Sequence, residues 1–177
     1  MSSVHTTTAI RGRFLDIQNT VAQAREIHDQ VRYVEDGLLI TQNGKISWFG
    51  EWEAGQQHIP ENTQIQHYPE QLIVPGFIDT HIHFPQTEMV GAYGEQLLEW
   101  LNTYTFPTEM QFADKNYADK IAQFFVHELL KNGTTTALVF CTVHPQSVDA
   151  LFEAAEQHQM RLIAGKVMMD RHAPDEL

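Results

Sequence analysis

Cysteine is nearly absent from this sequence: Cys141 is the single one among 177 residues. An internal disulfide is therefore impossible. A chain without disulfides is typical of a reducing compartment, so we expect a cytoplasmic protein. The single thiol also excludes metal sites built on paired cysteines, such as a Pro-Cys-x-x-Cys motif. Any metal ion must then be held by histidine and carboxylate side chains.

Basic residues and long apolar runs are scarce as well. The chain has 11 Lys and Arg against 23 Asp and Glu, a formal net charge of −12. Binding to phosphate groups needs clusters of Lys and Arg, so neither nucleic acid nor an anionic membrane is an expected partner. No segment approaches the roughly 18 to 20 apolar residues of a membrane span, and the start lacks the pattern of a secretory signal. The 42% hydrophobic and 19% charged residues are typical of a folded protein.

The most informative stretch is residues 72–88, which reads LIVPGFIDTHIHFPQTE. Its apolar run predicts a buried strand that ends in His81 and His83. Side chains alternate along a strand, so both imidazoles point to one face, about 7 Å apart between Cα atoms, and can bind one metal ion. Two solvent-facing imidazoles are the alternative, which burial of the strand disfavours. Asp79 has the same parity and either orients one of the histidines or bonds to local backbone.

The residues before this stretch predict a small β unit. Residues 9–17 form one strand, and residues 37–50 form a hairpin with an Asn-Gly turn in which Leu38 and Ile40 point inward. We expect a domain boundary near Glu70, after this unit.

The residues after it alternate between helices and strands. Residues 89–107 have no clean period and predict an irregular apolar loop that walls a pocket or covers the core. A helix from about Phe112, capped by Gly133, leads to a strand at 134–140. A second helix from Pro145 and a strand at 161–169 follow, which is the order of a parallel sheet with right-handed crossovers.

Several of these segments carry a family resemblance. PGFIDTHIH at 75–83 resembles the first barrel strand of the amidohydrolase superfamily. Within that superfamily the chain is similar to the guanine deaminases in FPQ at 84–86, LLEWLNTYTFP at 97–107, NGTTT at 132–136 and GKVMMD at 165–170. The resemblance covers essentially the whole chain.

The resemblance implies an α/β fold, the N-terminal part of a metal-dependent-hydrolase (β/α)₈ TIM-like barrel preceded by part of a small β-sandwich. Residues 1–70 would supply the N-terminal share of the sandwich, and residues 71–177 the first three strands and two helices of the barrel. The further metal ligands and the proton-transferring carboxylates cannot be assigned before Leu177, and a complete barrel takes about 250 residues. We therefore expect the N-terminal part of a longer enzyme, inactive by itself and a homodimer when complete.

The implied reaction is zinc-dependent hydrolysis of guanine to xanthine and ammonia, the work of a hydrolase acting on C–N bonds of cyclic amidines. One zinc ion per complete chain would be bound by His81 and His83. The segment His83, Phe84, Pro85 and Gln86 would contact the purine, and the Gln86 amide can both donate and accept hydrogen bonds. Trp100 is a further candidate for the pocket wall.

Two other functions remain open. The chain can belong to an amidohydrolase that acts on a related heterocycle, or it can be a non-catalytic, truncated homologue that serves as an assembly or binding module. His144, after the strand at 134–140, is one more side chain that could approach the site.

Overall fold

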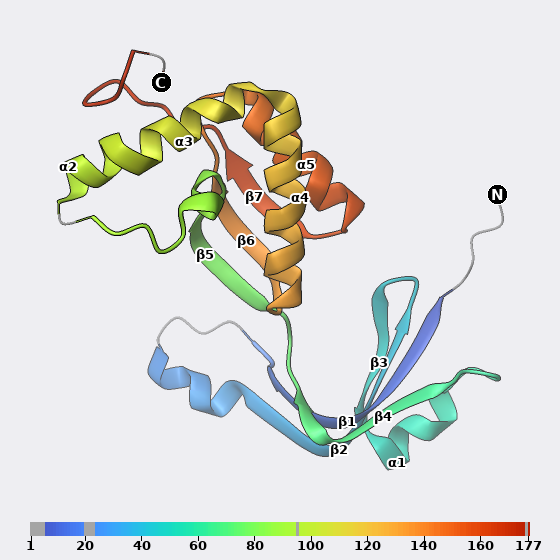
Figure 1. The fold of residues 1–177 in the computed structure, drawn as a ribbon. Helices are drawn as coiled ribbons and strands as arrows, with labels where there is room; N and C mark the ends of the chain where they lie inside the picture. Colours follow the sequence, from blue (N-terminus) through green and yellow to red (C-terminus); the bar gives the residue numbers. More distant parts are fainter. Residues whose placement is uncertain (1–5, 20–23, 95, 176) are drawn as a thin grey trace. The chain divides into compact units, whose positions relative to one another are not determined.

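The computed structural model describes residues 6–19, 24–94, 96–175 and 177, and contacts divide the chain into two compact units, Met1–Pro75 and Gly76–Leu177 (Figure 1). The first unit contains β1 (Thr7–Ile17), a 3₁₀ segment (Ala24–Gln30), β2 (Val31–Gln42), β3 (Lys45–Glu51), α1 (Trp52–Gly55), a second 3₁₀ segment (Gln56–His58) and β4 (Ile65–Ile73). Its strands form one sheet in the order β3-β2-β1-β4, antiparallel except for the parallel pair β1 and β4. A sandwich around this sheet stays a prediction.

The predicted hairpin is confirmed. β2 and β3 are joined by Asn43 (φ 53°) and Gly44 (φ 75°), both in the left-handed region that a tight hairpin turn requires. Leu38 and Ile40 are fully buried and form a small core with Ala9. The alternation along β2 therefore places Leu38 and Ile40 on the covered face of the sheet.

The start of the histidine strand was wrongly predicted. Leu72 and Ile73 belong to β4, where they pair with Arg13 and Phe14 of β1. The strand with the histidines, β5 (Phe77–His83), begins only after Pro75. The cause is that apolar residues on both sides of Pro75-Gly76 were assigned to one strand, whereas the chain passes from one sheet to the other there. The expected boundary near Glu70 falls inside β4, and the contacts divide the chain after Pro75.

The second unit alternates strands and helices as predicted. After β5 come a 3₁₀ segment (Phe84–Met89), α2 (Leu97–Trp100), a π-helical turn (Leu101–Thr105), α3 (Phe106–Met110), a 3₁₀ segment (Gln111–Ala113), α4 (Lys115–Lys131), β6 (Thr134–Phe140), α5 (Pro145–Gln157) and β7 (Arg161–Gly165). The strands β5, β6 and β7 form a parallel sheet in that order. Gly133, with φ 85°, follows α4 as the predicted cap.

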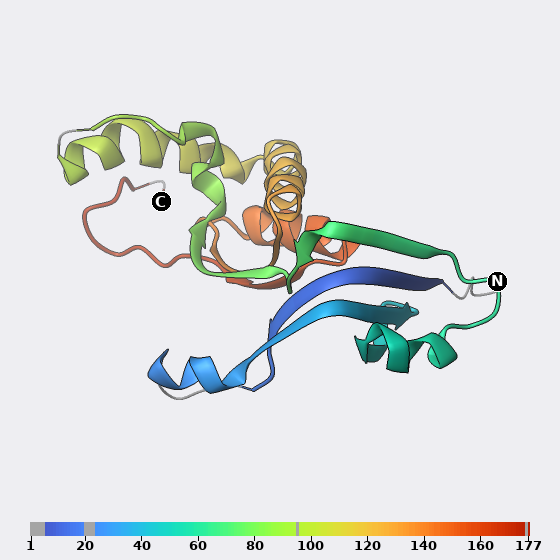
Figure 2. The same ribbon diagram turned by 90° about the horizontal axis from the view of Figure 1, so that it is seen from below.

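The helices α4 and α5 lie side by side on one face of this sheet (Figures 1 and 2). Their buried residues meet those of the sheet in one core, which includes Ala118, Ile121, Ala122, Phe125 and Val126 of α4, Ala137 and Val139 of β6, and Ala150, Leu151 and Ala154 of α5. This core supports the strands from one side. The prediction that β5 is covered on both faces is wrong, because it lies at an edge of the described sheet and Phe77 and Ile78 are 60% and 69% exposed.

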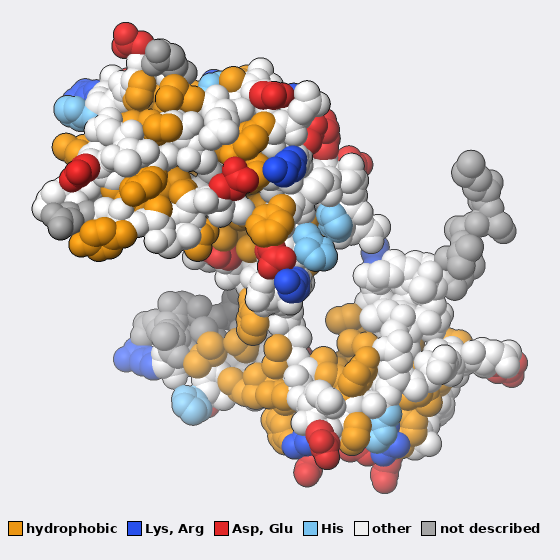
Figure 3. Space-filling view, viewed as in Figure 1, with side chains coloured by type: hydrophobic (Ala, Val, Ile, Leu, Met, Phe, Trp, Pro, Cys, Tyr) orange, Lys and Arg blue, Asp and Glu red, His pale blue; other side chains and the backbone are white. Residues whose placement is uncertain are grey.

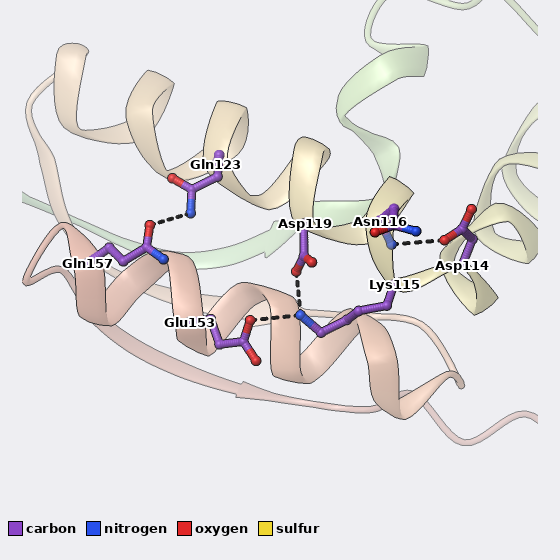
Figure 4. Close-up of polar contacts among 7 residues, drawn as sticks. All are labelled: Asp114, Lys115, Asn116, Asp119, Gln123, Glu153 and Gln157. Atoms are coloured by element: carbon purple, nitrogen blue, oxygen red, sulfur yellow. Dashed lines mark hydrogen bonds and ion pairs between the residues drawn. The ribbon is translucent and has the colours of Figure 1, made fainter.

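Polar contacts flank the helix pair (Figure 4). The Lys115 ammonium lies 2.5 Å from Asp119 Oδ1 and 2.7 Å from Glu153 Oε2, which links α4 to α5. Further along, Gln123 Nε2 donates to Gln157 Oε1 at 2.8 Å. Such exposed ion pairs contribute only about 0 to 1 kcal/mol each, so the apolar core supplies most of the stability and these contacts fix the helix register.

The predicted irregular loop at 89–107 is mostly helical from Leu97 onward. The π-helical turn adds a residue to one turn and shifts the spacing of the apolar side chains, which is why no helical period is visible in the sequence. Apolar side chains are exposed over this region (Figure 3), among them Leu97 and Leu98. β7 is shorter than the predicted strand and ends at Gly165. No helix in the described residues has the length and apolar character needed to cross a membrane.

Candidate metal and substrate site

His81 and His83 lie together at the end of β5. Their ring centroids are 5.3 Å apart, and both rings pack against Phe140 at the end of β6, at 5.0 Å and 4.9 Å. Ile82, between them in sequence, packs against the core on the helix side. The strand alternation therefore brings the two imidazoles to one face, as the sequence predicts.

The two rings are free to bind an ion. Neither imidazole makes a hydrogen bond to another described residue. Burial lowers the pKa of His83 below its usual value, and the nearby positive charge of His81 lowers it further. A neutral imidazole is the form that binds a metal ion, so the surroundings of His83 favour ligation.

Asp79 holds the backbone of the strand. Its Oδ1 accepts a hydrogen bond of 2.9 Å from the backbone N–H of His81. Of the two roles left open by the sequence, the structure thus shows the bond to local backbone. This bond fixes the peptide that carries the first histidine.

A cavity of about 690 Å³ opens beside the histidines. His81, His83, Gln86 and Trp100 line it, together with apolar residues of α4 and of the segment after β5. The Trp100 indole N–H donates to the carbonyl of Ala92 at 3.0 Å, which holds the ring in the wall. Trp100 therefore lies where a pocket wall was expected.

A second cavity of about 280 Å³ also borders His83 and Gln86. These two side chains line both cavities. The remaining walls come from the helical run after Leu97 and from residues 167–172, and they are formed by Leu98, Leu101, Thr105, Phe106, Glu109, Val167, Met169, Arg171 and His172. Gln86 can thus present its amide to a molecule in either space.

Phe84 and Pro85 do not line either cavity. The Phe84 ring is fully buried in the core, 5.0 Å from Phe112 and 5.5 Å from Phe125 between centroids. Its carbonyl accepts a hydrogen bond of 2.7 Å from the Thr87 hydroxyl. The Phe84 and Pro85 side chains are buried and anchor the segment that carries Gln86, and contact of this segment with a purine stays a prediction.

Two further titratable side chains are His144, which the sequence suggested for the site, and Glu109, which it did not. His144 bonds to Thr142 Oγ1 at 3.1 Å and lines neither cavity. Glu109, which the sequence analysis did not single out, is buried in the second cavity. Its burial depends on segments distant in sequence, so no local pattern marks it. Within the described residues no group of three or more His, Cys, Asp or Glu side chains could hold a metal ion.

A parallel β/α sheet whose first strand ends in two histidines on one face defines the class: the beginning of a metal-dependent-hydrolase barrel. Residues 72–176 match the amidohydrolase family, and the chain belongs to that family. The predicted fold class is thereby confirmed.

Three known proteins illustrate how far the likeness extends. Guanine deaminase of Escherichia coli is 61% identical over 177 residues, which are the whole chain but 40% of that protein. Its structure matches with a TM-score of 0.90, covering 96% of this chain and 39% of that one. A guanine deaminase of C. acetobutylicum with bound guanine is 28% identical, with a TM-score of 0.78 over 97% of this chain and 39% of that one.

A zinc complex of an atrazine chlorohydrolase from Arthrobacter aurescens shares the fold at 20% identity, with a TM-score of 0.65 over 90% of this chain and 35% of that one. In each case the chain spans about two fifths or less of the protein that it matches.

Proposed function

We propose that these residues form the first part of a guanine deaminase, which hydrolyses guanine to xanthine and ammonia. The observation that carries this proposal is the pair His81 and His83 on one face at the end of β5, with Gln86 beside them in a shared cavity wall. The 61% identity with E. coli guanine deaminase supports the choice of substrate.

The two histidines fit a zinc ion as half of its ligand set. Zinc takes neutral imidazole nitrogens at about 2.0 to 2.1 Å, and catalytic sites use three protein ligands. The free rings on one face and the lowered pKa of His83 meet the first requirement. The further ligands would come from outside the described residues. When bound, the metal ion supplies Lewis-acid chemistry and an activated water near neutral pH.

The side chains of this chain would bind and orient the substrate. The Phe140 ring packs against both imidazoles and would help to hold them in place. Gln86 offers an amide N–H and a carbonyl oxygen, which match the mixed donors and acceptors of a purine edge. Trp100 supplies an aromatic wall for a planar ring.

The proposal includes a homodimer in the cytoplasm for the complete enzyme. Cys141 is buried and free, which suits a reducing compartment. The dimer rests on the family resemblance alone. Gel filtration and sedimentation of the complete enzyme test it, and a monomer at micromolar concentration would contradict it.

A chimera tests the proposed activity directly. Residues 1–177 replace the matching segment of E. coli guanine deaminase, and the product is assayed for zinc, for xanthine and for ammonia. We expect one zinc ion per chain and guanine turnover close to that of the E. coli enzyme. A folded, zinc-loaded chimera that prefers another heterocycle would indicate a related hydrolase. A chimera with no turnover would favour a binding module and contradict the proposal.

A further inference from the structure

Glu109 is a buried carboxylate without a partner. Its side chain is 5% exposed on α3, and among the described residues it makes no hydrogen bond and no ion pair. Burial raises its pKa to about 7, with no compensating contact. A carboxylate buried in this way is costly to ionise, because its charge is partly removed from water and no described side chain compensates for the loss.

Thr105, one helical turn before Glu109, carries a second buried polar group without a hydrogen-bond partner in the described part of the chain. It is 2% exposed, and its Oγ1 has no hydrogen-bond partner. Residues four apart lie on the same side of a helix, and both side chains line the second cavity. Two unpartnered polar groups therefore face one space.

The rest of that space has the character of a small-molecule pocket. Leu98, Leu101, Phe106, Val167 and Met169 supply apolar walls, and His83 and Gln86 close the side toward the proposed metal site. Arg171 and His172 also line the cavity, but neither bonds to Glu109. Such pockets are mostly apolar, with a few polar groups that fix the orientation of a ligand. Glu109 and Thr105 are positioned to serve as such polar groups.

We propose that Glu109 is a specificity-determining residue that accepts a hydrogen bond from the imidazole N–H of the purine base, with the Thr105 hydroxyl beside it. This inference rests on the proposed function. Hydrolysis replaces the amino group of guanine, so the carbon that bears this group lies at the metal side of His83. The imidazole ring is the opposite end of the purine, and its N–H is the hydrogen-bond donor at that end.

The consequence is selection for the free base over its nucleoside. A nucleoside carries a sugar on the imidazole nitrogen and leaves the buried carboxylate unpaired. Sites that lose a buried hydrogen bond in this way discriminate strongly, because the desolvated group cannot be satisfied otherwise.

The chimera with E. coli guanine deaminase carries the test. Glu109→Gln keeps the volume and removes the charge, while Glu109→Ala also opens space. Glu156→Gln removes an exposed carboxylate on α5, away from both cavities, as the control. Each protein is assayed at equal zinc content with guanine, 9-methylguanine and 7-methylguanine, in which a methyl group occupies one imidazole nitrogen.

We expect Glu109→Gln to lower kcat/KM for guanine by about 10- to 150-fold, mainly through KM, with zinc content unchanged. The unsubstituted chimera should prefer guanine over at least one methylated base. Glu109→Ala should reduce the ratio of kcat/KM for guanine to kcat/KM for that methylated base about tenfold or more. The methyl group and the substitution remove the same hydrogen bond, so their effects do not add. Glu156→Gln should match the parent for all three bases.

Two results would overturn the inference. Losses of equal size for guanine and for both methylated bases would mean that Glu109 only supports the fold, and unchanged kcat/KM for guanine would remove it from the substrate site. If the alanine variant does not fold, Glu109→Leu, which removes the acceptor and keeps an apolar side chain in the cavity, carries the same comparison. An unsubstituted chimera that does not convert guanine refutes the proposed function itself. If the unsubstituted chimera is active and the Glu109 variants have the same kcat/KM values, only the inference about Glu109 is refuted.

Discussion

The imidazole of His83 stacks on the ring of Phe140 at 4.9 Å between centroids, with 18° between the ring planes. The stack connects the last residues of two neighbouring parallel strands, β5 and β6. It packs the His83 ring beside that of His81, and both side chains line one cavity. If the pair binds a metal ion as proposed, a ring held in this way lowers the entropic cost of ligation.

Replacing both His81 and His83 with alanine in the chimera should abolish zinc binding, since both side chains converge on one face. Zinc per chain is measured by metal analysis after dialysis against a weak chelator. The control is His127→Ala, an exposed histidine on α4 that lines neither cavity. Unchanged zinc in the double variant would remove the pair from the metal site.

Gln86→Ala should reduce guanine turnover in the chimera without loss of zinc. An amide that bonds the purine contributes about 1 to 3 kcal/mol, which corresponds to about 5- to 150-fold in kcat/KM. If Gln86 only braces its segment, the melting temperature should fall while kcat/KM per zinc-loaded protein barely moves. Measuring both quantities on one preparation separates these outcomes.

The 177-residue chain by itself should form no xanthine and should self-associate. Within the described residues no three possible metal ligands come together, the strand β5 has one outer edge without a partner, and Phe77 and Ile78 are largely exposed. Assay of the zinc-loaded chain and sedimentation at several concentrations check this. Turnover comparable to the E. coli enzyme, or a stable monomer, would contradict it.

Elements with an unbroken period could be predicted from the sequence. The apolar residues on one side of α4 and the alternation of Leu38 and Ile40 in β2 were both predicted, and β6 has the predicted bounds. The parity of His81 and His83 follows from strand geometry alone, which is why their shared face could be predicted.

The rest depends on interruptions and on distant contacts. The π-helical turn before Phe106 disturbs the helical period, and the change of sheet at Pro75 divides one apolar run. Glu109 is buried by segments that approach it only in the fold, from Leu98 to residues 167–172. A local pattern holds no information on such burial, so the second cavity could not be predicted.

Glu109 should also make the stability of the chain depend on pH. Burial raises its folded pKa from 4.5 to about 7, so between these values the folded state binds more protons than the unfolded state. The free energy of unfolding therefore falls as pH rises through this window. One pKa unit corresponds to about 1.4 kcal/mol, so the loss reaches up to about 3 kcal/mol above pH 7.

Glu109→Gln removes this titration at nearly the same volume. Its gain in the free energy of unfolding in the chimera, relative to the unsubstituted chimera, should be larger at about pH 8 than at about pH 5, by up to about 3 kcal/mol. His83, Arg171 and His172 line the same cavity and are present in both proteins, so the difference isolates the carboxyl group. Urea unfolding followed by circular dichroism at both pH values measures it, with Glu156→Gln as the exposed control. An equal gain at both pH values would show that Glu109 is hydrated in solution and would remove the carboxyl group from the buried wall.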